Sequence, residues 1–513
     1  MDGLTQNTGF NGLLTALVFL PFLFALVILI FARNDNHVRL MAGFGGLVEL
    51  ILSITVFIAY NKGEAGFQLI DRFNSWIPID TFRVEYFLGV DGLSVPMVLL
   101  TGILGMVAIL ASMGITNRVK QYFIWILILQ GAVFGVFTAL DFIMFFLFWE
   151  LELIPMFFLI STWGTGRKDY SAMKFIIFTF LGSAFMLVGI LALYISAGTF
   201  DMTSLPELVQ GGIKLIIPAG AIFGLLFVGF AVKLPVWPLH TWLPDAHTDA
   251  PTAVSVLLAG VLLKMGGYGM IRVTASIMPD VMSDLAWLLV AAGVINVLYG
   301  AVVTVRQTDL KRLVAFSSIS HMGYVLIGLS AIASKGTDAA AVGLTGASMQ
   351  MFTHGTITGL MFLTVGMIYD RTHTRYIPDL GGLSNRMPII GVAFLIAGLA
   401  SLGLPGTSGF AAEILVFLGA FPVWAWPTAL AVFGVVITAG YILWMTQRTL
   451  FGDMNNRWEK LTDASKLELI PIVMLVAAIL VFGIYPAFLT DLFKMSVEPI
   501  VAAVNSSPEI LSR

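Results

Sequence analysis

The sequence predicts an all-α polytopic membrane protein with about 14 transmembrane helices, and three observations lead to this prediction. First, 58% of the 513 residues are hydrophobic and only 11% are charged, whereas a soluble globular chain has about 45–50% apolar and about 25% charged residues. Second, one bilayer span needs about 20 apolar residues, so the apolar residues suffice for roughly 14 spans. Third, these residues lie in separate stretches of span length.

A hydropathy window of about 19 residues locates each span along the chain. The fourteen candidates lie at 11–32, 38–60, 86–113, 119–138, 141–162, 172–197, 213–247, 251–275, 284–306, 309–331, 338–369, 388–419, 426–451 and 466–490. The longest connections, 61–85 and 452–465, are too short for a soluble domain. Neither a Walker A pattern nor a dinucleotide-binding glycine motif occurs.

The composition excludes several classes of chemistry in this chain. There is no cysteine, which excludes disulfides, a thiolate nucleophile and cysteine-ligated iron–sulfur or zinc sites. Six histidines offer little for a haem or a histidine-rich metal site. No block of basic residues indicates binding to nucleic acid. We therefore expect neither a cofactor nor a metal in the chain itself.

The distribution of lysine and arginine predicts the orientation. If the N-terminus faces the outer side, 17 of the 27 Lys and Arg residues fall on inner loops and 8 on outer segments, and the other two, Lys233 and Lys264, lie inside spans. Positive charges are enriched on the cytoplasmic side of membrane proteins. Both termini are therefore expected on the outer side, which agrees with an even number of spans.

Two of the spans are interrupted by helix-breaking residues. The seventh contains prolines at 235, 238 and 244, and the twelfth contains the run LGLPGTSG at 402–409. Each is the fourth span of a five-span run, and corresponding broken helices in two halves are typical of an inverted repeat around an ion path. We therefore expect N-terminal helices over 1–113, repeats over 119–275 and 284–451, and a last helix with a tail over 452–513. Two unrelated proline kinks are the alternative.

Six ionisable side chains are expected near the middle of spans, where charge costs at least about 2.5–3.5 kcal/mol per residue. They are Glu150, Lys233, Lys264, His321, His354 and Glu413. Two carboxylates, two amines and two imidazoles at similar depth can form a polar axis parallel to the membrane. A lysine that alternates between a near and a distant carboxylate can hold a proton and then release it, so we predict that Lys233 switches with Glu150.

Each assignment has a structural alternative. Glu150 and Lys233 could form a static ion pair that fixes helix register, and Lys264 could be equally static. His321 and His354 could be packing residues.

Five other polar residues are harder to assign. Glu152 is treated as structural or auxiliary, Asp91 as a helix-capping acid, and Glu49 as a buried acid outside both repeats. His240 and His247 are auxiliary candidates for an exit path if the helix resumes in register after its break.

One long motif resembles a known family. The run FAVKLPVWPLHTWLPDAHTDAPTAVSVLLAG at 230–260, continued by LKMGGYG at 263–269, is similar to the antiporter-like membrane subunits of respiratory complex I, which are relatives of Mrp-type sodium/proton antiporter subunits. The chain length, the run LGVDGLS at 88–94 and the acid at Glu413 resemble the subunit M (chain 4) group. In one departure from repeat symmetry, Lys233 precedes its break whereas Glu413 follows its own.

The resemblance implies a proton-translocating subunit of NADH:quinone oxidoreductase. It matches Glu150, Lys233, Lys264, Glu413, His321 and His354 to positions of the proton path. It also implies that NADH, FMN, iron–sulfur clusters and quinone bind to other subunits, and that the partners are lipid and other membrane subunits such as L and N. The expected location is the bacterial inner membrane rather than the mitochondrial one. An Mrp-type Na⁺/H⁺ antiporter subunit or a hydrogenase-linked pump is the alternative.

Overall fold

The computed structural model describes residues 10–77, 84–335 and 337–506. Within them, 12 helical segments are long and apolar enough to cross a membrane. Ten are single helices: α1 (Leu13–Phe31), α2 (Asp35–Ala59), α3 (Ser94–Ala111), α4 (Val119–Thr138), α7 (Lys168–Ala197), α14 (Ala286–Val305), α15 (Leu310–Ser330, extended by η3, Ala331–Ser334), α16 (Asp338–Thr372), α19 (Ala425–Leu450) and α20 (Lys466–Ile484). Both chain ends, which the charge distribution assigns to the outer side, lie outside the described residues.

The two other spans change helix type or direction on the way. One comprises α5 (Phe142–Leu151) and α6 (Leu153–Trp163), which meet at Glu152. Pro155 explains this kink, because it cannot donate to the carbonyl of Leu151 and its ring clashes with that group. The other comprises α11 (Thr252–Leu257), the π-helix η1 (Leu258–Leu262), α12 (Leu263–Gly269) and the π-helix η2 (Met270–Ala275).

The structure confirms both breaks. The seventh span is divided into α9 (Ala219–Lys233) and α10 (Trp242–Asp249), and the twelfth into α17 (Pro388–Ser401) and α18 (Ser408–Ala420). Prolines separate the first pair, and a glycine-rich turn with Gly403 at φ 76° separates the second. A positive φ favours glycine, which has no Cβ to clash with the backbone.

The connection 61–85 differs from its expectation as a plain loop. It forms an antiparallel hairpin of β1 (Gln68–Ile77) and β2 (Val84–Val90), in which Asp71 is paired with Leu88. The expected third span at 86–113 is therefore wrong at its start, because α3 begins at Ser94. The Asp71 carboxylate accepts hydrogen bonds from the backbone N–H groups of Gly12 and Thr15. It thus satisfies donors that the first turn of α1 leaves free.

The expected tail contains a further helix, α21 (Ala487–Ser506). Its residues Leu489, Leu492, Phe493, Val497 and Val501 are buried, and they recur at helical spacing along one face. That face packs against α16, α3 and the short helix α13 (Pro279–Asp284). The remaining short elements are α8 (Leu205–Gln210), η4 (Ile377–Asp379), η5 (Leu383–Asn385) and η6 (Asn456–Trp458).

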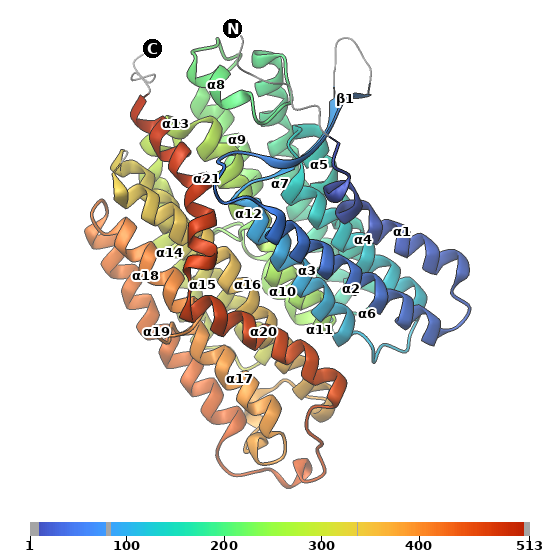
Figure 1. Ribbon diagram of the computed structural model, residues 1–513. Helices are drawn as coiled ribbons and strands as arrows, with labels where there is room; N and C mark the ends of the chain where they lie inside the picture. The colour runs from blue at the N-terminus through green and yellow to red at the C-terminus, as the bar shows by residue number, and fades with distance from the viewer. Residues whose placement is uncertain (1–9, 78–83, 336, 507–513) are drawn as a thin grey trace.

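The central helices are enclosed by the others (Figure 1). The N-terminal helices, in blue, lie on one side and α18 and α19, in orange, on the other, with α12, α15 and α16 between them. In the spans 252–275, 310–334 and 338–372 the most apolar window is 100% buried, whereas it is 33% buried in α1, α2 and α20. Lys264, His321 and His354 lie on these enclosed helices.

A buried ion pair joins three distant parts of the chain. Arg272 on η2 contacts the carboxylate of Asp91, and Ser496 on α21 donates to the same carboxylate over 2.8 Å. Asp91 also caps α3 by accepting from the backbone N–H of Ser94 at 3.0 Å, so the expected capping role is confirmed. Burial raises the pKa of Asp91, but Arg272 and these hydrogen bonds hold it below its usual value.

We expect Arg272→Met to destabilise the protein by about 3–5 kcal/mol, because it leaves the Asp91 carboxylate buried without its cation. The double variant Arg272→Met/Asp91→Asn should recover much of this loss, since both charges are removed together. The measurement is the melting temperature of the purified complex. Arg312→Met is the control, because the Arg312–Asp245 pair at 3.5 Å is 39% exposed on the arginine side. Equal losses in the single and double variants would contradict this account.

Candidate functional site

Four of the six predicted site residues form one continuous row inside the protein. Lys264 Nζ lies 2.7 Å from His354 Nδ1. The rings of His354 and His321 lie 5.7 Å apart between centroids, and His321 Nε2 lies 3.9 Å from Glu413 Oε1. All four side chains are at most 5% exposed. The row therefore connects α12, α16, α15 and α18.

The π-helical turns around α12 position Lys264. Its Nζ donates to the carbonyl of Ala259, five residues earlier within η1. A π-helical turn widens the backbone and changes which carbonyls are used by the helix. Gly266 then lets α12 approach the first break, because a Cβ there would lie 2.6 Å from the backbone nitrogen of Leu234. Glycine is thus required where the two segments meet.

The second break holds the other end of the row. A Cβ on Gly403 would lie 2.6 Å from Glu413 Oε2, so the carboxylate rests against the unwound turn. His321 Nε2 lies 2.9 Å from the carbonyl oxygen of Ser401, and His321 Nδ1 lies 2.8 Å from that of Ser317. Both ring nitrogens therefore face acceptors, one of which lies at the end of α17.

Lys233 pairs with a different carboxylate from the one expected. Its Nζ forms an ion pair with Glu152 Oε1 and lies 5.4 Å from the ring centroid of Trp149 and 5.7 Å from that of Phe175. Glu152 is fully buried, whereas Glu150 is partly exposed. From the sequence, Glu152 is expected to be structural or auxiliary. The structure places it, rather than Glu150, in contact with Lys233, and residues two apart on a helix point to nearly opposite sides.

Lys233 and Glu152 form a second cluster, separate from the row. Within the described residues, no hydrogen bond or ion pair connects this pair to Lys264. The elements that carry the two lysines, α9 and α12, do pack against each other. The charge of Glu150 interacts with that of Lys233, although its buried Oε1 has no hydrogen-bond partner in the part of the chain that the structure describes.

The auxiliary histidines lie outside both clusters. His240 Nε2 lies 3.3 Å from the hydroxyl of Tyr299 on α14. His247 stacks on Phe362 of α16, with ring centroids 4.6 Å apart, and neither of its ring nitrogens has a hydrogen-bond partner among the described residues.

Sequence reasoning missed Lys311, which is buried at the start of α15 and donates to the carbonyl of Ala250. A lysine in the first turn of a fully enclosed helix is the signal that could have identified it.

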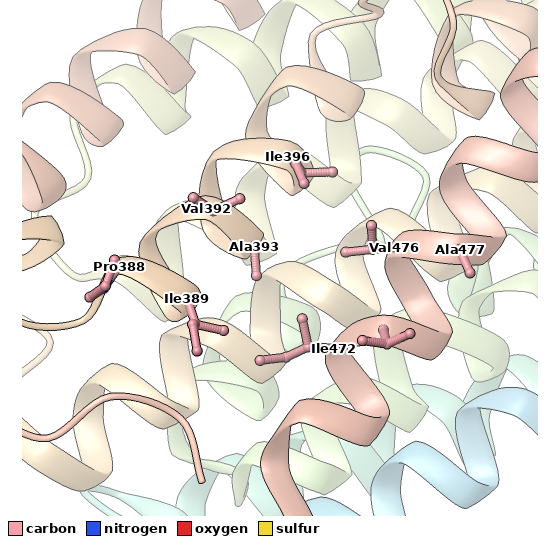
Figure 2. A pocket seen from close by; sticks show the side chains of 9 residues that line it. Pro388, Ile389, Val392, Ala393, Ile396, Ile472, Val476 and Ala477 are labelled. Atoms are coloured by element: carbon pink, nitrogen blue, oxygen red, sulfur yellow. The ribbon is translucent and has the colours of Figure 1, made fainter. Parts of the chain in front are cut away.

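The described residues provide neither a second proton path in the apolar groove nor a metal site. The groove between α17 and α20 in Figure 2 is lined by apolar side chains alone, namely Pro388, Ile389, Val392, Ala393, Ile396, Ile472, Val473, Val476 and Ala477. It therefore offers no group for proton transfer. No group of three or more histidine or acidic side chains in the described ranges is arranged to hold a metal ion.

Comparisons with known proteins agree with this geometry. Residues 139–438 match the family described as NADH:quinone oxidoreductase/Mrp antiporter, TM. The chain is 39% identical over 514 residues to NADH-quinone oxidoreductase subunit M of Rhodobacter capsulatus, covering 96% of each chain. It is 40% identical to NAD(P)H-quinone oxidoreductase chain 4 1 of Synechococcus elongatus, covering 97% of this chain and 93% of the relative.

Two solved structures are also similar. A chain of respiratory complex I from Thermus thermophilus with bound NADH gives a TM-score of 0.85 at 26% identity, covering 96% of this chain and 99% of that one. A chain of the Mrp complex from Dietzia gives 0.82 at 19% identity, covering 97% and 99%, and so shares the fold alone. The protein therefore belongs to the NADH:quinone oxidoreductase/Mrp antiporter family, as an antiporter-like membrane-arm subunit of the group named subunit M or chain 4 in complex I.

Proposed function

We propose that this chain carries protons along the row of Lys264, His354, His321 and Glu413, and that Lys233 controls their supply. The observation that supports the proposal most directly is the row itself. Four titratable side chains from four helices meet without an apolar residue between neighbours. Each buried charge is costly in a bilayer, so four adjacent titratable groups support a role in moving charge.

His321 suits a relay because of the two carbonyls beside it. A neutral imidazole has one N–H and can donate to only one acceptor, whereas a protonated imidazole has two. With carbonyl oxygens 2.8 and 2.9 Å from its two nitrogens, His321 gains a hydrogen bond when it takes up a proton. Glu413, 3.9 Å away, is then the next acceptor in the row.

The Lys233–Glu152 pair supplies the control step. Lys233 ends α9, where the negative end of the helix dipole favours a cation, and Glu152 adds a full opposite charge. Separating the two would leave a buried ammonium without its anion, which favours release of its proton. We retain Glu150, which lies two residues before Glu152 and is partly exposed, as the carboxylate that exchanges with Glu152 for Lys233.

The energy required is within reach of such pairing. Moving one charge against 100 mV costs about 2.3 kcal/mol, and a change of about 2 pKa units corresponds to about 2.7 kcal/mol. Two buried lysines also suit protons rather than sodium ions, because an ammonium group cannot coordinate a metal cation.

The exit path is proposed to include His247 as an auxiliary residue. It stacks on Phe362, which follows His354 by eight residues on α16, or about 12 Å along a helix axis. His240, beside Tyr299, is the corresponding auxiliary residue nearer the first break.

The two broken helices support the proposed five-helix repeats over 119–275 and 284–451.

The redox chemistry is proposed to belong to other subunits. The chain has no cysteine for an iron–sulfur cluster, and FMN, NADH and quinone are assigned elsewhere in the complex. We propose subunits L and N as neighbours in a bacterial inner membrane, with both termini on the outer side.

Lys233→Ala should nearly abolish proton pumping and strongly reduce coupled quinone reduction, because it removes the amine that holds and releases the proton. The measurement is proton uptake by inverted membrane vesicles that oxidise NADH. The assembled complex should remain present, and full pumping at a normal assembly level would exclude Lys233 from the mechanism.

Glu152→Gln and Glu150→Gln should distinguish the Lys233–Glu152 ion pair from the proposed exchange of Glu150 for Glu152 as the partner of Lys233. We expect the Glu152 variant to lower both assembly and pumping, because Lys233 loses the anion that it contacts. Glu150→Gln should reduce pumping while assembly stays normal, and Glu150→Asp should retain part of the activity. If Glu150→Gln pumps like the wild type, Glu150 has no part in the exchange.

Glu413→Gln should stop pumping if the carboxylate is the last proton acceptor of the row. An amide keeps the shape and can hydrogen-bond to local backbone, so a capping role alone would survive this change. Glu413→Lys restores a titratable group with the opposite charge and should pump partially. The measurement is proton pumping in proteoliposomes at matched assembly levels. Normal pumping by Glu413→Gln would remove Glu413 from the relay.

A further inference from the structure

A buried acid lies well away from the two clusters, on α2 at the edge of the bundle (Figure 1). Glu49 is 0% exposed, and neither of its carboxylate oxygens has a hydrogen-bond partner among the described residues. A buried polar group without a partner is costly. Glu49 therefore needs either a proton, a ligand or both.

The helices around Glu49 provide no opposite charge. α2 packs against α1, α3 and α4, and α1 and α3 contain no Asp, Glu, Lys, Arg or His. On α4, Lys120 is in the first turn and donates to the carbonyl of Ala32, and the Tyr122 hydroxyl bonds with Ser112. The charged residues of α2 itself, with His37, lie at its start, and Arg39 is ten residues from Glu49, about 15 Å along the axis.

A second unpartnered polar side chain lies beside α3 at the same level. Gln130 on α4 is 1% exposed, and neither atom of its amide has a partner within the described ranges. Its amide occupies the space that a Cβ on Gly105 would fill. The Gln130 amide therefore lies against the backbone of α3 at Gly105.

The register of α2 and α3 brings Glu49 to this place. Ser53 occupies the space beside Gly102, and a Cβ on Gly46 would lie 2.5 Å from Ile109. Glu49 lies between Gly46 and Ser53 on the same buried face of α2. It is thus level with the part of α3 between Gly102 and Ile109, where Gln130 fills the notch at Gly105.

We propose that Glu49 and Gln130 form a site that binds a proton and one water molecule. The carboxyl group is neutral, with one O–H donor and one carbonyl acceptor, and the amide offers an N–H donor and a carbonyl acceptor. A water molecule between them satisfies both groups, as buried waters usually make about three hydrogen bonds. This site is separate from the proposed proton row. Glu49 lies outside both proposed repeats, whereas Gln130 lies on the first helix of the repeat over 119–275.

The test is infrared difference spectroscopy on the assembled complex in membranes, wild type against Glu49→Gln. The variant should lose the C=O band of a protonated carboxylic acid and no carboxylate band, and the band should shift in D₂O. Gln130→Leu should move the same band, because the acid loses a hydrogen-bonded neighbour. Glu64→Gln is the control, since Glu64 is exposed and should lose carboxylate bands only.

Three outcomes would overturn the proposal. They are loss of carboxylate bands in Glu49→Gln, a Glu49 band that does not respond to D₂O, and an unchanged band in Gln130→Leu. If Glu49→Gln fails to assemble, Glu49→Asp keeps the acid one methylene shorter, and its acid band should be present at a shifted position. Its absence would likewise exclude a neutral acid. These readouts do not depend on pumping, so they are independent of the proposed proton row.

Discussion

The cost of placing unsatisfied polar groups in hydrocarbon governs this structure. Two helices are unwound at the breaks after Lys233 and Ser401, and free backbone groups at membrane depth are tolerated only inside protein or beside water. The helices α12, α15 and α16 are enclosed completely, while α1, α2 and α20 remain at the edge. The breaks lie beside the enclosed helices, and Trp237 and Leu404 at the breaks are exposed in this chain. Lys264, His354 and His321 lie on the enclosed helices, where burial strengthens electrostatic interactions.

The division of the buried charges into two clusters has a mechanistic consequence. The Lys233–Glu152 pair belongs to the first break and the row from Lys264 to Glu413 extends to the second, with the packed contact of α9 and α12 between them. A proton or an electrostatic influence must cross this contact for the halves to act together. Gly266 allows α12 to lie close to the end of α9. The distance between the two clusters therefore depends on a residue that carries no charge.

The C-terminal helix gives the enclosed spans an external support. α21 packs across α16, α3 and α13, and Ser496 joins the Asp91–Arg272 pair. This contact links the hairpin end of α3 to the π-helical end of the span that carries Lys264. A rearrangement of that span would therefore be resisted at its η2 end, whereas the Lys264–His354 contact in its middle involves side chains alone.

The sequence by itself determined the membrane class, the positions of nearly all spans and both breaks, because hydropathy and proline or glycine act locally. It also identified Lys264, His354, His321 and Glu413, since any charge inside an apolar stretch is conspicuous. Only the tertiary structure decided that Glu152 rather than Glu150 contacts Lys233. Residues two apart point to nearly opposite sides of a helix, and the sequence does not show which side faces α9. The hairpin and α21 were also missed. The apolar residues of α21 recur at helical spacing, but its packing partners α16, α3 and α13 are distant in the sequence and were decided by the tertiary structure.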